Sequence, residues 1–179
     1  PDWSNFYGNV EENLPLDAPT PHGKEMIIRC FVDADHAGDL LTRRSRTGFM
    51  IYLNNAPIYW YSKKQTTVET STFGSEIIAL QIAIEMIKGL RCKLRMMGVP
   101  IDGPTSVFCD NESVVKSSSF AETTLKKKHC SIAFHKVREC VAAGKQLIYY
   151  EKTTSNLADL FTKVLPSSKR KVLVEAILV

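Results

Sequence analysis

Cys30-Phe31-Val32-Asp33-Ala34-Asp35 is the stretch of sequence that decides the fold of this chain. It closes an almost unbroken apolar run from Met26 to Val32, which is typical of a central strand in a sheet. The run stops at carboxylates, and a buried carboxylate costs desolvation energy unless a cation or hydrogen bonds compensate it. The stretch therefore predicts a buried strand that carries acidic groups into a functional site.

Three other acidic residues lie at the edges of periodic segments. Glu76 falls on the apolar face of a helix expected over residues 71–97, and Asp110 follows a short strand expected over 105–109. Asp159 falls in a short helix further along the chain. Four carboxylates packed together would raise one another's pKa values, and divalent cations relieve that repulsion. We expect these acids to converge with the strand-end carboxylate and hold metal ions.

Each acid also has an ordinary structural interpretation. A strand-end Asp is more often a turn former than a ligand, and Asp110-Asn111 could cap a helix. Asp159 alone would be a first-turn acid favoured by the helix dipole. Glu76 is the hardest to explain in this way, because a carboxylate on an apolar helix face needs compensation. Spacing alone therefore leaves both the metal site and the structural roles open.

Composition bounds the class of protein. A length of 179 residues with 44% hydrophobic and 23% charged residues fits one globular domain. No apolar run approaches the roughly 18–20 residues of a membrane span, and no signal pattern is present, so we expect an intracellular protein with no membrane partner. The net charge of +4 permits a polyanionic partner without demonstrating one. The five cysteines are interpreted as buried thiols rather than zinc ligands or disulfide partners.

The order of elements predicts an α/β fold with helices on the faces of a mixed sheet. Asn54-Asn55-Ala56-Pro57 separates two strand-like runs and predicts a hairpin. Residues 1–25 are rich in proline and are expected to form an extended tether, and the start without Met suggests a piece of a longer protein. Residues 26–166 are expected to form the domain, and 167–179 a C-terminal tail with a packing helix as one option.

A series of short motifs runs in order from about residue 28 to 166. The motifs are Phe31 to Asp39, Arg43-Arg44-Ser45, Pro57 to Gln65, Ser71-Thr72 with Glu76 to Leu80, Cys109-Asp110-Asn111, Lys128-His129 and Asn156 to Lys163. Together they resemble the ribonuclease H domain of a copia-type retrotransposon polyprotein, downstream of its reverse transcriptase. The resemblance implies a ribonuclease H-like fold, with a five-stranded mixed sheet whose first three strands are antiparallel, flanked by helices.

The resemblance also implies a function and a site. The family hydrolyses the RNA strand of RNA/DNA hybrids during reverse transcription, with two Mg²⁺ ions or Mn²⁺ in their place. Its catalytic and metal-binding pattern maps onto Asp33, Glu76, Asp110 and Asp159. Asp35 points to the same strand face as Asp33 and is a candidate auxiliary ligand. The implied partners are the hybrid and a covalently linked reverse transcriptase, and the implied location is the cytoplasm, in particles of the element.

Three positions depart from the family pattern. Gly74 stands where members usually carry an acid, Ile77 where they commonly carry an aromatic residue, and Glu112 where they commonly carry Gln. A negative Glu112 could weaken hybrid binding or bind metal. The mobile-loop His of cellular ribonucleases H has no counterpart here, and His36, His129 and His135 are interpreted as structural or RNA-contacting.

Candidate nucleic-acid contacts are basic runs and a few polar residues beside the acids. A nuclease that is indifferent to sequence reads phosphates and 2′-hydroxyls. The alternative for each basic residue is a solvated surface, and helix capping is the alternative for the hydroxyl residues before the catalytic Glu. The candidates are Arg43, Arg44, Arg46, Lys63, Lys64, Ser71, Thr72, Asn111, Lys126, Lys127 and Lys128.

Two functions of other classes stay open beside an endonuclease. One is a catalytically weak or inactive hybrid-binding module on the same fold. The other is an integrase-like enzyme, which normally needs three carboxylates and transfers DNA strands. Cleavage of hybrid, duplex RNA and duplex DNA in parallel separates the three.

Overall fold

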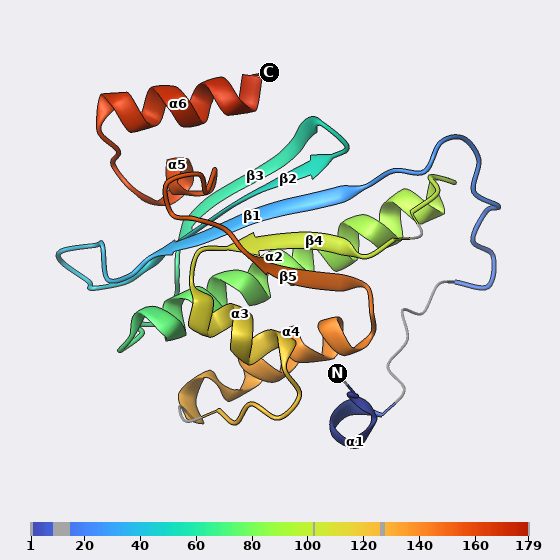
Figure 1. Cartoon of the computed structure of the whole chain (residues 1–179), viewed down its shortest axis with the longest axis horizontal. Coiled ribbons are helices and arrows are strands. Elements are labelled where there is room, and N and C mark those ends of the chain that lie inside the picture. The colour runs from blue at the N-terminus through green and yellow to red at the C-terminus, as the bar shows by residue number, and fades with distance from the viewer. Residues whose placement is uncertain (1, 9–14, 102, 126–127, 179) are drawn as a thin grey trace.

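A central sheet with helices on both faces makes up the computed structural model of this chain (Figure 1). The structure describes residues 2–8, 15–101, 103–125 and 128–178. Among these residues, none of the helices has the length and hydrophobicity that a bilayer span needs.

The sheet has five strands in the order β3-β2-β1-β4-β5. Strands β1, β2 and β3 pair antiparallel, whereas β4 pairs parallel with both β1 and β5. The predicted mixed sheet with three antiparallel strands first is therefore confirmed, as is the hairpin between β2 and β3. The strands are β1 (Ile28–Asp35), β2 (Arg46–Leu53), β3 (Ala56–Lys64), β4 (Thr105–Cys109) and β5 (Gln146–Tyr150).

Helices α2, α3 and α4 cover one face of the sheet, and α5 and α6 lie over the other (Figure 1). Helix α6 forms in the C-terminal tail, where a packing helix was one option. The helices are α1 (Ser4–Tyr7), α2 (Thr72–Met96), α3 (Glu112–Ser119), the 3₁₀ helix η1 (Lys128–Cys130), α4 (Ser131–Ala142), α5 (Asp159–Thr162) and α6 (Ser167–Leu178).

Helix α2 begins and ends where its sequence directs. The Ser71 hydroxyl accepts a hydrogen bond from the Gly74 backbone N–H at 3.2 Å, which satisfies one of the donors at the start of the helix. Gly98 follows its end with a φ of +76°, a conformation that glycine adopts without a Cβ clash. Between these points Ile77, Leu80 and neighbouring apolar residues pack against the sheet.

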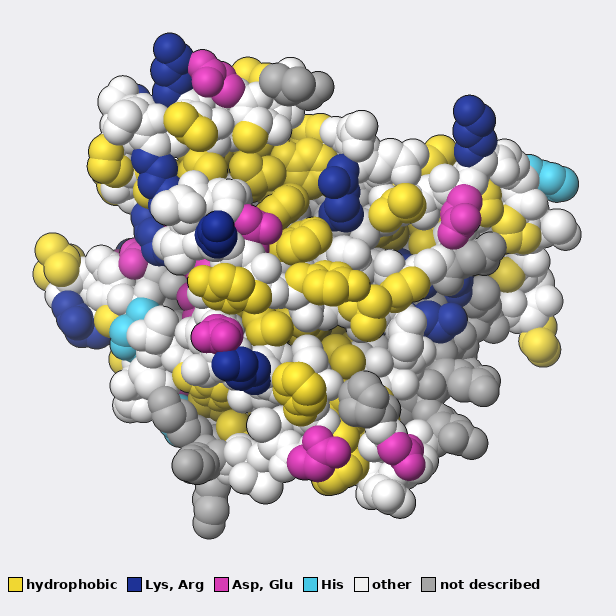
Figure 2. Space-filling view, in the orientation of Figure 1, with side chains coloured by type: hydrophobic (Ala, Val, Ile, Leu, Met, Phe, Trp, Pro, Cys, Tyr) yellow, Lys and Arg dark blue, Asp and Glu magenta, His cyan; other side chains and the backbone are white. Residues whose placement is uncertain are grey.

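Strand β1 feeds two hydrophobic cores by alternation. Cys30 and Val32 are buried in the main core between the sheet and α2, α3 and α4, and Phe31 faces the opposite side. There Phe31 stacks on Phe108 of β4 with ring centroids 5.0 Å apart, and Phe108 stacks on Tyr149 of β5 at 5.7 Å. Figure 2 shows hydrophobic side chains in a row across this face. The second, smaller core lies on this face beneath α6, and Phe31 packs against it.

Cys30, Cys109 and Cys130 are buried, as the sequence predicts, whereas Cys92 and Cys140 are half-buried. Cys30 and Cys109 are fully buried in β1 and β4, and burial raises the pKa of both thiols above the ordinary range. Among the described residues, none of the five cysteines forms a disulfide.

The N-terminal stretch, which is expected to be an extended tether, contains one short helical turn. Residues 4–7 form this turn, α1, and the Asp2 carboxylate just before it accepts hydrogen bonds from the backbone N–H and hydroxyl of Ser4. Aromatic rings in and just before this turn lie around the guanidinium of Arg138 on α4. Arg138 Cζ is 5.0 Å from the ring centroid of Trp3 and 5.8 Å from that of Tyr7. The Tyr7 hydroxyl also lies 2.7 Å from His135 Nδ1, so this histidine has a structural contact.

Arg138→Gln should lower the free energy of unfolding by about 3 kcal/mol, because Arg138 is buried and several contacts are lost together. Its guanidinium donates to the carbonyls of Thr123 at 2.8 Å and Ala121 at 2.5 Å and lies beneath the α1 rings. Lys136→Gln, on the exposed side of the same helix, should change stability little. Urea unfolding of both variants checks this, and equal losses would contradict it.

Candidate active site

The four predicted acids converge at one end of the sheet. The parallel register that pairs Val32 with Cys109 brings Asp33 beside Asp110, just beyond the end of β4. Oxygens of Asp33, Asp110 and Asp159 all lie within 4.8 Å of one another. Donor atoms of Glu76, Cys109 and Asp110 form a second group within the same limit. Asp110 therefore belongs to both groups and joins them.

Two local contacts hold α5 close to the sheet, which places Asp159 beside Asp33 and Asp110. Gly48 of β2 lies opposite Asp33, and a Cβ on it would lie only 2.5 Å from Thr162 Cγ2. Only glycine leaves room for this close approach. The buried Asn156 side chain donates to the Val32 carbonyl at 3.0 Å and so fixes the preceding turn to β1. Sequence reasoning did not single out either contact.

Glu76 is a buried carboxylate with incomplete compensation. Glu76 is only 4% exposed. Burial, and next to it the negative charges of Asp33 and Asp110, raise the pKa of its carboxyl well above the ordinary value. Among the described residues, no group hydrogen-bonds to its buried Oε2. A buried acceptor without a partner is costly, and a cation or a proton is the natural complement.

Two lysines that sequence reasoning missed compensate the charges of Asp33 and Asp159. Lys163 Nζ lies 3.0 Å from Asp33 Oδ1 and 2.7 Å from Asp159 Oδ1. Lys169 of α6 pairs with the other oxygen of Asp159 and donates to the Thr153 carbonyl at 2.9 Å. The position of Lys163, four residues after Asp159, was a detectable signal for an ion pair. Nothing local pointed to Lys169, which approaches only because α6 packs over the sheet.

These pairs leave the centre negatively charged. Burial raises the pKa of Asp33 to about 6, although the Lys163 ammonium and the Thr162 hydroxyl, which both donate to it, oppose the shift. Burial alone would lower the pKa of Lys163, but the carboxylates of Asp33 and Asp159 outweigh it and raise that pKa. In the part of the chain that the structure describes, four carboxylates thus face two ammonium groups.

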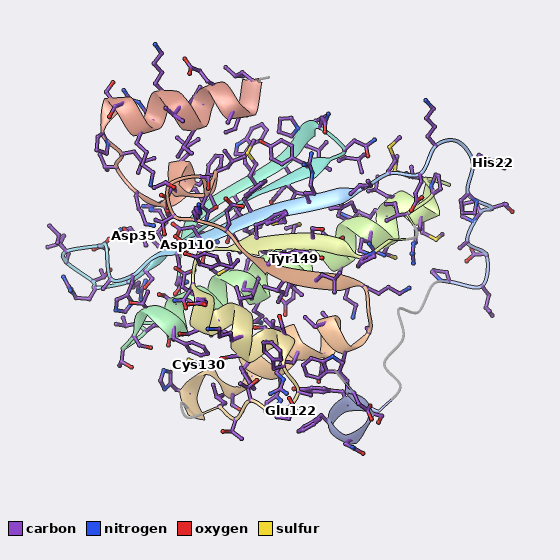
Figure 3. All side chains as sticks on the ribbon, viewed as in Figure 1. His22, Asp35, Asp110, Glu122, Cys130 and Tyr149 are labelled. Carbon is purple, nitrogen blue, oxygen red and sulfur yellow. The ribbon has the colours of Figure 1, made fainter. Side chains whose placement is uncertain are left out.

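The donor chemistry of the centre fits hard divalent cations. Mg²⁺ and Mn²⁺ prefer oxygen ligands, and carboxylate oxygens from four segments of the chain gather here, including the unpartnered Oε2 of Glu76. Asp33, Glu76, Asp110 and Asp159 could therefore hold such ions. Asp35 lies at the same end of the sheet (Figure 3). The Asp35 carboxylate lies against Gly38, and Asp35 belongs to neither donor group. Its role as an auxiliary metal ligand therefore stays a prediction.

Part of the predicted nucleic-acid surface borders the acids. Arg44, Arg46 and Lys64 line a cavity of about 460 Å³ together with Asp35 and Thr162. Among the other basic candidates, Arg43 and Lys63 are exposed, and Lys126, Lys127 and the side chain of Lys128 lie outside the described residues.

The polar candidates have structural contacts. Asn111 caps α3 by accepting a hydrogen bond from the Val114 N–H at 3.2 Å, as Ser71 caps α2, and Thr72 is exposed at the first position of that helix. Their contacts with nucleic acid stay predictions. Glu112 is exposed, and its Oε1 lies 2.8 Å from Lys116 Nζ. It belongs to neither donor group of the acidic centre.

Comparison with known proteins identifies related sequences and folds. The retrovirus-related Pol polyprotein from transposon TNT 1-94 of Nicotiana tabacum is 31% identical over 147 residues, which are 82% of this chain and 11% of that protein. The corresponding polyprotein from transposon RE2 of Arabidopsis thaliana is 28% identical over 143 residues, 80% of this chain and 10% of that protein. The chain thus spans about a tenth of the length of these relatives. No family model matches the sequence.

The fold has counterparts among solved structures. A crystal structure of LC11-RNase H1 in complex with an RNA/DNA hybrid superposes with a TM-score of 0.60 at 18% identity. The match covers 75% of this chain and 93% of that one. The ribonuclease H-like fold expected from the motifs is confirmed.

Glu76→Gln should raise the free energy of unfolding in chelator by about 1 kcal/mol near pH 8, because it removes a buried charge at little cost in volume. The folded-state pKa of Glu76 is raised, so its ionisation costs stability as pH rises above the unfolded pKa. The difference between variant and wild type should therefore vanish toward pH 4. Thermal unfolding across pH checks this, with the exposed Glu112→Gln as control. A variant less stable than wild type at pH 8 would contradict the account.

Proposed function

Because this chain is homologous to one segment of the retrovirus-related Pol polyproteins of plant copia-type transposons and has a ribonuclease H fold, we propose that it hydrolyses the RNA strand of RNA/DNA hybrids. The observation that carries the proposal is the convergence of Asp33, Glu76, Asp110 and Asp159 at one sheet end. The hybrid bound to LC11-RNase H1 supports the same substrate class.

The chain's own residues would hold the reacting groups in place. The Thr162 hydroxyl and the Lys163 ammonium fix the Asp33 carboxylate, and Lys163 and Lys169 hold Asp159 from two sides. Such fixed carboxylates need little rearrangement when substrate arrives. Bound divalent cations would supply positive charge for phosphodiester hydrolysis, leaving 5′-phosphate ends. The carboxylate oxygens of the two donor groups that share Asp110 would suit two ions, Mg²⁺ or Mn²⁺, and the buried Cys109 thiol of the second group would not be one of their ligands.

Substrate would lie along the basic cavity beside the acids. The Arg44 and Arg46 side chains that line it are suited to phosphate oxygens, which position a duplex without reading its sequence. Asp35 and Asp39 add negative charge to the same lining, and Asp39 is paired with Lys64, so the two arginines would be the main contacts to the strand.

The wider setting follows from the relatives. We place a reverse transcriptase in the parent polyprotein as the linked partner, with residues 1–25 as the connection and 26–166 as the catalytic domain. We also place its action inside the cell, in particles of the element; the transposon origin of the relatives supports the first part of this proposal.

A catalytically weak hybrid-binding module is the second candidate. The observation that favours it is the pairing of Lys163 and Lys169 with the acids, since ammonium groups at these oxygens compete with divalent cations. A module of this kind would bind hybrid without cutting it in Mg²⁺.

Asp110→Asn should lower hybrid cleavage in Mg²⁺ by at least about 100-fold, because Asp110 joins both donor groups and the substitution removes its charge. The same change at the exposed Asp17 should leave the rate unchanged. Single-turnover cleavage of an end-labelled hybrid measures both. Full activity of the Asp110 variant would exclude this residue from catalysis.

Arg44→Gln should weaken hybrid binding by about 3- to 10-fold and reduce the slope of log affinity against log salt by about one. The exposed Lys24→Gln removes the same charge away from the cavity and should change neither quantity. Fluorescence anisotropy over a salt series checks both variants. An equal loss for the two variants would indicate general attraction rather than a contact at the cavity.

A further inference from the structure

A second cluster of donor groups lies outside the acidic centre. Glu69 belongs to the connection between β3 and α2, and His129 and Cys130 belong to η1. Glu69 Oε2 lies 3.2 Å from His129 Nε2 and 3.5 Å from Cys130 Sγ. The donor atoms of all three residues lie within 4.8 Å of one another. Figure 3 shows Cys130 well apart from Asp35 and Asp110.

From these contacts we propose that Glu69, His129 and Cys130 form a second metal site, which binds Zn²⁺. A thiolate, an imidazole and a carboxylate are the ligand types that Zn²⁺ takes in proteins, whereas Mg²⁺ prefers oxygen alone. None of these residues belongs to the donor groups of the acidic centre, so the site stands whether or not that centre cleaves hybrid.

Two of the three donor separations match tetrahedral zinc. Usual Zn²⁺ bond lengths and a tetrahedral angle place a carboxylate oxygen about 3.4 Å from an imidazole nitrogen and about 3.6 Å from a thiolate sulfur. The distances from Glu69 Oε2 are 3.2 Å to His129 Nε2 and 3.5 Å to Cys130 Sγ, and the donor atoms of His129 and Cys130 lie within 4.8 Å of each other. A hydrogen bond from a thiol to a carboxylate has a similar length. These distances alone therefore do not distinguish a zinc site from a hydrogen-bonded cluster, and the surroundings of the cluster have to decide.

The surroundings of the cluster supply the deciding observations. Glu69 and Cys130 are 8% and 2% exposed, whereas the His129 side chain is 48% exposed. Two of the ligands are thus buried, and the third borders solvent. On that side an ion could enter, and a water molecule could complete its coordination shell. Thr67 Oγ1 donates to Glu69 Oε1 at 3.2 Å, which orients the carboxylate with Oε2 toward the other donors.

Gly74 gives the cluster its space. A Cβ at this position would lie 2.5 Å from Glu69 Oε2 and 3.3 Å from Cys130 Sγ. A side chain at residue 74 would therefore displace the Glu69 carboxylate. The glycine that departed from the family pattern leaves room for a carboxylate supplied by Glu69, another position that sequence reasoning missed.

A zinc ion here would have a structural consequence. It would join η1, directly before α4, to the start of α2, and the second turn of α2 carries Glu76. Because the ion would bind only the folded arrangement, Zn²⁺ should stabilise the protein by mass action. Its effect on hybrid cleavage would be indirect, through the position of α2.

Titration with CoCl₂ and ZnCl₂ tests the site directly, using the full chain without a polyhistidine tag after removal of metals. Co²⁺ should give a tetrahedral visible spectrum with a thiolate-to-cobalt band, which ZnCl₂ abolishes and excess MgCl₂ does not. Cys130→Ser should remove the thiolate band, and Cys92→Ser should keep it. Glu69→Gln should weaken Zn²⁺ binding at least about 10-fold, measured by competition with a chromophoric chelator.

A second variant keeps the test decisive if Cys130→Ser does not fold. His129 is half-exposed, so His129→Gln should fold and should weaken Zn²⁺ binding at least about 10-fold. The exposed His22→Gln, at the other end of the molecule in Figure 3, should bind Zn²⁺ as wild type does. The absence of a thiolate band in wild type, its persistence in Cys130→Ser, or unchanged binding by His129→Gln would overturn the proposal and leave only a hydrogen-bonded cluster.

Discussion

The burial of carboxylates at one end of the sheet is the constraint on which the rest of this structure depends. Asp33 and Asp159 are completely buried and Glu76 almost so, in a place where each raises the cost of ionising its neighbours. A fold with no functional use for such a cluster would be more stable with apolar residues there. The cost is understandable if the cluster serves to bind cations and position a phosphodiester.

The surrounding structure is arranged to keep the carboxylates together. Gly48 lets α5 approach β1, and Asn156 anchors the turn before it to the strand. Lys163 and Lys169 then supply the positive charge that reaches the centre from α5 and α6. Glu76 receives no such partner among the described residues for its Oε2, which makes it the point where a cation would relieve most cost.

The sequence predicted those parts of the fold and site that depend on local pattern. Asp33 and Glu76 were recognisable because strand and helix periods place them in apolar surroundings. Lys169 and Glu69 were not recognisable, because each meets its partners only through the tertiary fold. The turn α1 was missed for the same reason, since its proline-rich context predicts extended chain and its stabilising partner Arg138 lies on α4.

Cleavage of an RNA/DNA hybrid by the wild-type chain tests the central claim most directly. The hybrid, duplex RNA and duplex DNA should be incubated in parallel with Mg²⁺, with Mn²⁺ and with chelator. We expect cutting of the RNA strand of the hybrid alone, with 5′-phosphate ends, and only when a divalent ion is present. A hybrid that is bound but left intact in both ions, or cut equally well in chelator, would contradict the account.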